Sequence, residues 1–280
     1  MASITDHEAE QIANANATGR TPLVFVHGLW LLASSWRRWA ELFEQEGYAA
    51  VMPGWPDDPE TVEQARANPA ALAGKTVGQV AAHLDEVLGR LERKPALIGH
   101  SFGGLLVQIL AGQGLAEVTV AIDPAPFRGV LALPISALRA VGPVLANPLN
   151  RRRAVALSYG QFRFAFANAV SELEARHLYE TFAVAAPGAP IFQAAFANLN
   201  PWTELRVDSE NPSRGPLLIT SGERDSAVPW AIANGAYKRQ ARNRGVTEIA
   251  EIPGRGHALT IDSGWREVAD TALAFVKRFT

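Results

Sequence analysis

Three residue types that together can activate an alcohol occur in this sequence, each just after an apolar run. Ser101 lies between Gly99 and Gly103 and directly follows the apolar run 96–98. A nucleophile on so sharp a turn has a strained backbone, and glycines two residues to either side remove the collisions that bulkier neighbours would cause. The pattern Gly-x-Ser-x-Gly, followed by an apolar helix-like segment, therefore predicts a serine nucleophile at the end of a strand.

A serine hydroxyl is a weak nucleophile and needs a histidine base that a carboxylate orients. Asp225 follows the apolar run 217–220, and His257 follows the strand-like run 248–252. We expect both side chains to meet Ser101 at the carboxyl edge of a parallel sheet, where ligands bind in open α/β folds. Asp123, which ends the preceding apolar run, could serve as the acid in place of Asp225.

Acyl transfer through a serine also requires two N–H donors for the negative charge that develops on the carbonyl oxygen. One would come from Phe102, the residue after the nucleophile. The other would come from the turn after the first apolar run, most plausibly from Leu29, because Gly28 lets the backbone bend close to the reacting carbon. Trp30 in the same turn is either a wall of the pocket or part of the core.

The elements that must position these residues are strands that alternate with helices. Six runs are rich in β-branched and apolar residues, at 23–26, 49–52, 96–98, 118–122, 217–220 and 248–252. Between and after them, apolar residues repeat at helical spacing, most clearly from Thr76 to Leu91 and from Trp265 to Phe279. This alternation predicts the α/β class, with an open, mostly parallel sheet of about six strands flanked by helices.

Residues 126–212 interrupt the strand–helix rhythm. They contain several helical patterns and 7 of the 12 phenylalanines. We therefore expect a helical cap inserted after the fourth strand, with residues 1–125 and 213–280 forming the core. Aromatic residues of the cap would be core first and pocket lining second, and the run Arg151–Arg153 would be a solvated helix face.

Taken together, these motifs resemble those of the α/β-hydrolases, of the capped esterase type. The matching segments are His-Gly-x-x after the first strand, Gly-His-Ser-x-Gly-Gly, Gly-x-x-Asp-x-x-Val-Pro and Gly-x-x-His, spread over residues 22–279. The resemblance implies that Ser101, His257 and Asp225 form a catalytic triad that cleaves carboxylic esters with apolar groups through an acyl-enzyme. It leaves open lactone hydrolysis, carbon–carbon bond hydrolysis, hydroxynitrile lyase and perhydrolase chemistry on the same triad, and a non-catalytic small-molecule receptor.

In one respect the sequence departs from the family pattern. The family usually has an antiparallel hairpin before the first motif strand, whereas about 20 polar residues precede that strand here. They are too poor in strand-like residues to form two strands. We expect six parallel strands, with the hairpin absent or replaced by a helix.

Composition excludes several classes of function. The chain has 280 residues, a formal net charge of −2 and no cysteine. The balanced charge argues against nucleic acid or an anionic membrane as a partner, and the lack of cysteine excludes disulfides and thiolate catalysis. The first residues lack the apolar segment of a signal peptide, so we expect a cytoplasmic protein that acts on a small-molecule ester. The histidine spacing suggests no metal, no cofactor is implied, and the oligomeric state is left open.

Overall fold

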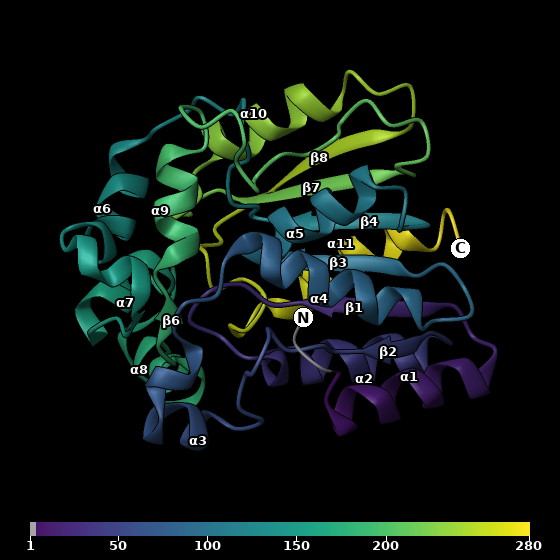
Figure 1. Ribbon diagram of the computed structural model, residues 1–280, viewed down its shortest axis with the longest axis horizontal. Helices are drawn as coiled ribbons and strands as arrows, with labels where there is room; N and C mark the ends of the chain where they lie inside the picture. Colours follow the sequence, from purple (N-terminus) through teal and green to yellow (C-terminus); the bar gives the residue numbers. More distant parts are fainter. Residues whose placement is uncertain (1–3) are drawn as a thin grey trace.

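The computed structural model describes residues 4–280 and contains one six-stranded sheet at its centre (Figure 1). All five strand pairs are parallel, in the order β2-β1-β3-β4-β7-β8. The strands are β1 Pro22–Val26, β2 Ala49–Val51, β3 Ala96–His100, β4 Val118–Ile122, β7 Leu217–Gly222 and β8 Thr247–Ile252. The predicted open, parallel α/β sheet of six strands is confirmed.

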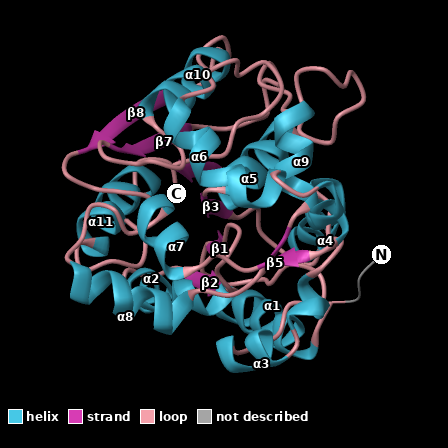
Figure 2. Ribbon diagram, turned by 90° about the vertical axis from the view of Figure 1, so that its left-hand side faces the viewer, coloured by secondary structure: helices cyan, strands magenta, loops and turns pink. Residues whose placement is uncertain are grey.

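Helices cover both faces of the sheet, as Figures 1 and 2 show. On one face lie α1 Asp6–Thr18, α4 Val77–Gly89, α5 Phe102–Gly112 and α10 Trp230–Gln240; on the other lie α2 Arg37–Gln45 and α11 Trp265–Val276. Successive strand residues point to opposite faces. Val24 and Val26 accordingly join the first core, whereas Leu23 and Phe25 join the second. Parallel strands covered on both sides must be apolar throughout, and β1, β3, β4 and β7 are buried at every position.

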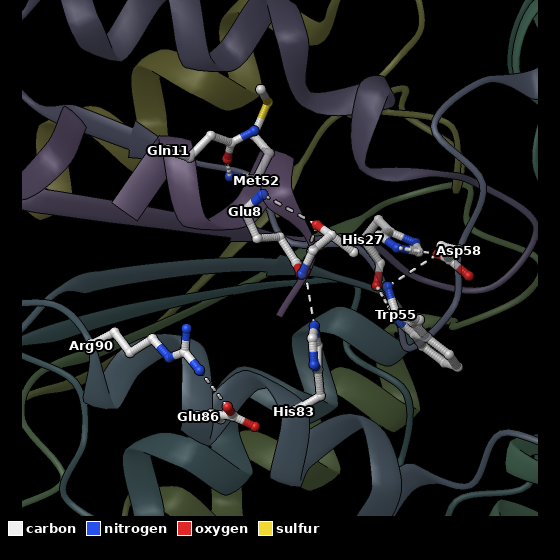
Figure 3. Close-up of polar contacts among 10 residues, drawn as sticks. Glu8, Gln11, His27, Met52, Trp55, Asp58, His83, Glu86 and Arg90 are labelled. Carbon is white, nitrogen blue, oxygen red and sulfur yellow. Dashed lines mark hydrogen bonds and ion pairs between the residues drawn. The ribbon is translucent and has the colours of Figure 1, made fainter. Parts of the chain in front are cut away.

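The chain before β1 forms a helix. In α1, Thr5 and Glu8 form a capping box, in which each side chain bonds the other residue's backbone N–H. Glu8 also lies 2.9 Å from His83 Nε2 on α4, and both side chains are buried (Figure 3). Helix α1 packs along β2, so a helix precedes the first strand and no hairpin is found within residues 4–21.

Residues 55–75 contain regular structure although they are rich in Pro, Asp and Asn. They include α3 Val62–Ala67 and a short 3-10 helix, Pro69–Leu72. Thr61 and Gln64 form the capping box that starts α3. The pattern Thr-x-x-Gln is a helix-start signal that the many Pro, Asp and Asn residues around it obscured.

The segment between β4 and β7 lies at the carboxyl end of the sheet, on the left of Figure 1. It comprises α6 Ile135–Leu145, a 3-10 helix Pro148–Arg152, α7 Tyr159–Ala165, α8 Glu172–Phe182 and α9 Ala189–Phe196. A two-residue antiparallel pair, β5 Ala154–Val155 with β6 Ala186–Pro187, closes it. Arg151, Arg152 and Arg153 are exposed, at the end of the 3-10 helix. Within residues 4–280, none of the helices has the length and hydrophobicity that crossing a membrane requires.

Candidate active site

Ser101 lies on a tight turn between β3 and α5. Its backbone φ is +58°, a left-handed conformation that is rare for a residue other than glycine. A Cβ at Gly99 would overlap the carbonyl oxygen of Gly103, and one at Gly103 would overlap that of Val26. The turn therefore forms only because both flanking positions are glycine. It holds the Ser101 side chain at the carboxyl edge of the sheet.

His257 connects the serine to a carboxylate. It comes from the loop after β8, and its Nε2 lies 3.0 Å from Ser101 Oγ. Its Nδ1 lies 2.6 Å from Asp225 Oδ2, in the loop after β7. The other oxygen of Asp225 accepts hydrogen bonds from the backbone N–H groups of Ala227 and Val228, at 2.7 and 2.8 Å. This carboxylate fixes the tautomer in which Nδ1 donates to Asp225 and Nε2 accepts from the serine hydroxyl.

Asp123, the alternative acid, lies beside this pair. Its Oδ2 is 3.9 Å from His257 Nδ1, beyond hydrogen-bond distance, and its Oδ1 accepts from Gly222 N at 2.7 Å. Strands β4 and β7 are neighbours in the sheet, so the residues that follow them meet. The structure thus places Asp225 in direct contact with the histidine and Asp123 behind it.

Burial sets the electrostatics of the site. It raises the pKa of Asp123 well above its usual range, and the adjacent charge of Asp225 raises that pKa further. Burial also holds the pKa of His100 well below its usual range, with His257 as the second cause. The His100 ring packs on that of His257, with centroids 4.6 Å apart. A neutral His100 adds no positive charge next to the base.

The two predicted N–H donors belong to segments that adjoin the serine. Phe102 is the first residue of α5, where backbone N–H groups have no partner within the helix. A Cβ at Gly28 would come within 2.8 Å of Ser101 Cβ and 3.3 Å of Phe102 N, so the turn that contains Leu29 packs directly on Ser101. This close approach is what a two-donor site for an oxyanion requires.

Trp30 connects this turn to the inserted segment. Its φ is +66°, its indole Nε1 donates to Val155 O at 3.0 Å, and its carbonyl accepts from Val184 N at 3.1 Å. The ring meets Phe166 edge to face, and Phe166 packs in the same way on His257. Trp30 is therefore both a wall of the cavity beside the serine and a contact between two parts of the chain.

A cavity with an almost wholly apolar lining opens at Ser101. Helices α6 and α9 supply one wall, while Trp30, Phe166 and Val228 contribute others. Small side chains are frequent in this lining, namely Ala125, Ala132, Ala137, Ala140, Ala165, Ala194, Ala195 and Ala227. Such a cavity favours an apolar substrate group next to the nucleophile.

His27 does not reach the serine. Its Nδ1 lies 2.9 Å from Gly28 O, and its Nε2 lies 3.1 Å from Asp58 Oδ2 (Figure 3). The ring packs against Trp55, whose indole N–H donates to His27 O. Asp58 was not among the predicted site residues, because its contact with His27 spans a loop that carries no motif. Its contacts support the turn that contains Leu29.

One group of side chains within residues 4–280 has the types and spacing to hold a metal ion. It consists of His100, Asp123 and His257, whose ligand atoms lie within 4.8 Å of one another. These residues are far apart in the sequence, so histidine spacing could not reveal the group. His257 Nδ1 is already bonded to Asp225 at 2.6 Å, which fits a proton-transfer arrangement better than a metal centre.

Comparison with solved structures identifies the same fold in several hydrolases. A monoacylglycerol lipase from Paleococcus ferrophilus superposes with a TM-score of 0.64 at 19% identity, covering 92% of this chain and 95% of that one. An extracellular α/β-hydrolase from a Paenibacillus species gives 0.65 at 19% identity, covering 91% and 98%. A pyrethroid hydrolase from Sphingobium faniae gives 0.64 at 16% identity, covering 92% and 97%.

Sequence comparison adds the family. No curated protein matches the sequence significantly. A model of the alpha/beta hydrolase family matches residues 23–271. This range contains all the site residues described above and every strand of the sheet, apart from the first residue of β1. The chain belongs to the alpha/beta hydrolase family.

Proposed function

We propose that the protein is a serine hydrolase that cleaves carboxylic esters with an apolar acyl or alcohol part. The observation that carries this proposal is the chain of contacts from Asp225 through His257 to Ser101, which ends at the apolar cavity. Residues 126–212 act as a cap, since α6 and α9 supply a wall of that cavity. The esterase and lipase activities named for structural neighbours agree with this choice of bond.

The reaction proceeds in two halves through an acyl-enzyme. Ser101 Oγ attacks the ester carbonyl while His257 Nε2 takes the hydroxyl proton, and the N–H groups of Leu29 and Phe102 bind the oxyanion. The tetrahedral intermediate collapses, and the leaving alcohol takes the proton from Nε2. Water then gives a proton to Nε2 and attacks the acyl carbon, so that the acid leaves and the serine regains its proton. Asp225 stabilises the imidazolium in both halves.

The site assignment is tested by labelling and by substitution. A fluorophosphonate should label Ser101, located by peptide mapping, and Ser101→Ala should lower kcat on p-nitrophenyl butyrate by at least about 10⁴-fold. Ser209→Ala, on the loop before β7, is the matched control and should behave like the native protein. Labelling at another residue, or undiminished turnover by Ser101→Ala, would refute the assignment.

The substrate class needs a separate panel. We expect simple esters to be cleaved faster than lactones or vinylogous diketones, and kcat/KM to rise with acyl chain length until the cavity is filled. Single-turnover measurements separate a slow enzyme from a receptor that only binds. A strong preference for a non-ester would retain the serine mechanism but contradict ester hydrolysis as the main activity.

A further inference from the structure

The Asp123 carboxyl group has an oxygen that nothing in the described structure satisfies. The side chain is fully buried, and Oδ1 accepts one hydrogen bond, from Gly222 N at 2.7 Å. Within residues 4–280, Oδ2 has no hydrogen-bond donor. The backbone φ of Asp123 is +41°, strained for a residue with a side chain, and its N–H donates to Thr220 O. Backbone strain and an unsatisfied buried oxygen together indicate a functional role for Asp123.

Asp123 and Asp225 cannot both be carboxylates at low cost. Their Oδ2 atoms approach the same nitrogen, His257 Nδ1, at 2.6 Å from Asp225 and 3.9 Å from Asp123, and both side chains are buried. The titratable groups around them are His100 at the end of β3 and His257 after β8; within residues 4–280 no lysine or arginine forms an ion pair with either carboxylate. Two adjacent anions in a buried site repel strongly, and a single shared proton removes the repulsion.

The donors around the two groups decide which one holds that proton. Asp225 receives three hydrogen bonds, from Ala227 N, Val228 N and His257 Nδ1, which stabilise its anion. Asp123 receives one. A protonated Asp123 would also turn its unsatisfied oxygen into a donor, with the Asp225 carboxylate as the neighbouring acceptor. The raised pKa of Asp123 agrees with this assignment.

We propose that Asp123 is a positioning residue that carries a proton and donates it in a hydrogen bond to the Asp225 carboxylate. His257 is then oriented by a carboxylic acid–carboxylate pair with a single negative charge, rather than by one aspartate. Since Asp123 Oδ2 is 3.9 Å from His257 Nδ1, a small shift would let Asp123 orient the histidine when Asp225 cannot. The inference concerns the site of the proposed function and rests on it for its kinetic consequences.

A spectroscopic test does not depend on any substrate. Infrared difference spectra in H₂O and D₂O at pH 7 should contain a carboxylic-acid C=O band that Asp123→Asn removes. Asp58→Asn, the control at a partly buried aspartate outside the pair, should leave that band in place. Absence of the band in the native protein, or its persistence in Asp123→Asn, would overturn the proposal even if the ester activity is established.

Kinetics test the role of the pair. In Asp225→Asn the neighbouring anion is lost, Asp123 ionises more readily, and we expect kcat to fall by about 10²-fold. In the double variant Asp123→Asn/Asp225→Asn we expect a loss of about 10⁴-fold, the effect known for a triad without its carboxylate. Equal kcat values for the two variants would contradict the proposal. Failure of the ester assay in the native protein would count against the proposed function alone, because the infrared result stands independently.

Discussion

The contacts around Ser101 depend on the absence of side chains at particular positions. Gly28 packs its backbone against Ser101, where a Cβ would lie 2.8 Å from both Ser101 Cβ and His100 O. Those two atoms belong to the strained turn and cannot move freely. At this scale the chemistry is set by how closely one backbone segment approaches another.

Gly28→Ala should therefore damage the reaction more than the fold. The added methyl group pushes the turn away from Ser101 and displaces the Leu29 N–H, so we expect kcat to fall by about 10²-fold or more, as for loss of one oxyanion donor. Unfolding free energy should fall by about 1–3 kcal/mol from overpacking. Steady-state kinetics and thermal melts measure the two effects. Gly160→Ala, where the methyl group meets no atom within 4 Å, is the control. If Gly28→Ala lowers the melting temperature but leaves kcat unchanged, the close approach at Gly28 has no part in the reaction.

At the scale of elements, the inserted segment holds the loops that carry the site. Phe166 O accepts from Ala258 N, next to His257, and Asn168 Nδ2 donates to Arg224 O, next to Asp225. Trp30, in the turn after β1, bonds Val155 of β5 and Val184, which lies just before β6. The segment after β4 therefore contacts the loops that follow β1, β7 and β8.

Trp30→Phe tests this connection. The substitution keeps an aromatic ring beside Phe166 but removes the indole N–H, which leaves Val155 O without that donor. We expect kcat/KM to fall by about 10-fold, since an unsatisfied buried polar group costs about 1–3 kcal/mol and the turn is free to shift. The matched control is Trp202→Phe, at a tryptophan that is 86% exposed. Equal kcat/KM for the two variants would show that the indole bond has no part in positioning the turn.

Local patterns were sufficient for most of the sheet and for locating the three side chains, Ser101, Asp225 and His257, that meet at its carboxyl edge. Ser101 and Asp225 follow the buried strands β3 and β7, His257 follows the edge strand β8, and parallel strands place their carboxyl ends at one edge. The contact of Trp30 with Val155 spans 125 positions, and that of Glu8 with His83 spans 75. Neither has a local signature, because such pairs depend on how separate elements pack, and single-sequence patterns report only neighbours in the chain.

At the scale of the whole molecule, α1 is joined to the rest through polar contacts, of which the one between Glu8 and His83 is buried. Glu8 bonds His83 on α4, Gln11 accepts from Met52 N after β2, and Asn16 contacts the chain after α4. Burial alone would raise the pKa of Glu8, but the hydrogen bonds from His83 and Thr5 outweigh it and hold the pKa below 4.5. A carboxyl group with a lowered pKa stabilises the fold above its unfolded pKa, and this contribution is lost as the pH falls through the folded value.

Glu8→Gln should consequently lower stability at neutral pH and flatten the acid limb of the stability profile. Native protein should lose stability below about pH 4.5 as Glu8 takes up a proton. The variant has no titratable group at position 8, so this part of the loss should be absent. Thermal melts between pH 3 and pH 7 measure the difference. Glu10→Gln, an exposed change on the same helix, should keep the native profile. Parallel profiles for Glu8→Gln and the native protein would exclude this anchor as a source of acid sensitivity.

The bonds from Phe166 and Asn168 to the two loops also affect how the fold can be recombined. Residues 166–168 belong to the inserted segment in the chain but touch Arg224 and Ala258 of the core. A chimera that takes the whole inserted segment, residues 126–212, from another hydrolase would lose the hydrogen bonds to the loops after β7 and β8 as well as the cavity lining. If the exchanged part leaves out residues 166–168 of this chain, the cavity wall formed by α6 would be replaced. The hydrogen bonds that hold the loops of His257 and Asp225 would stay in place.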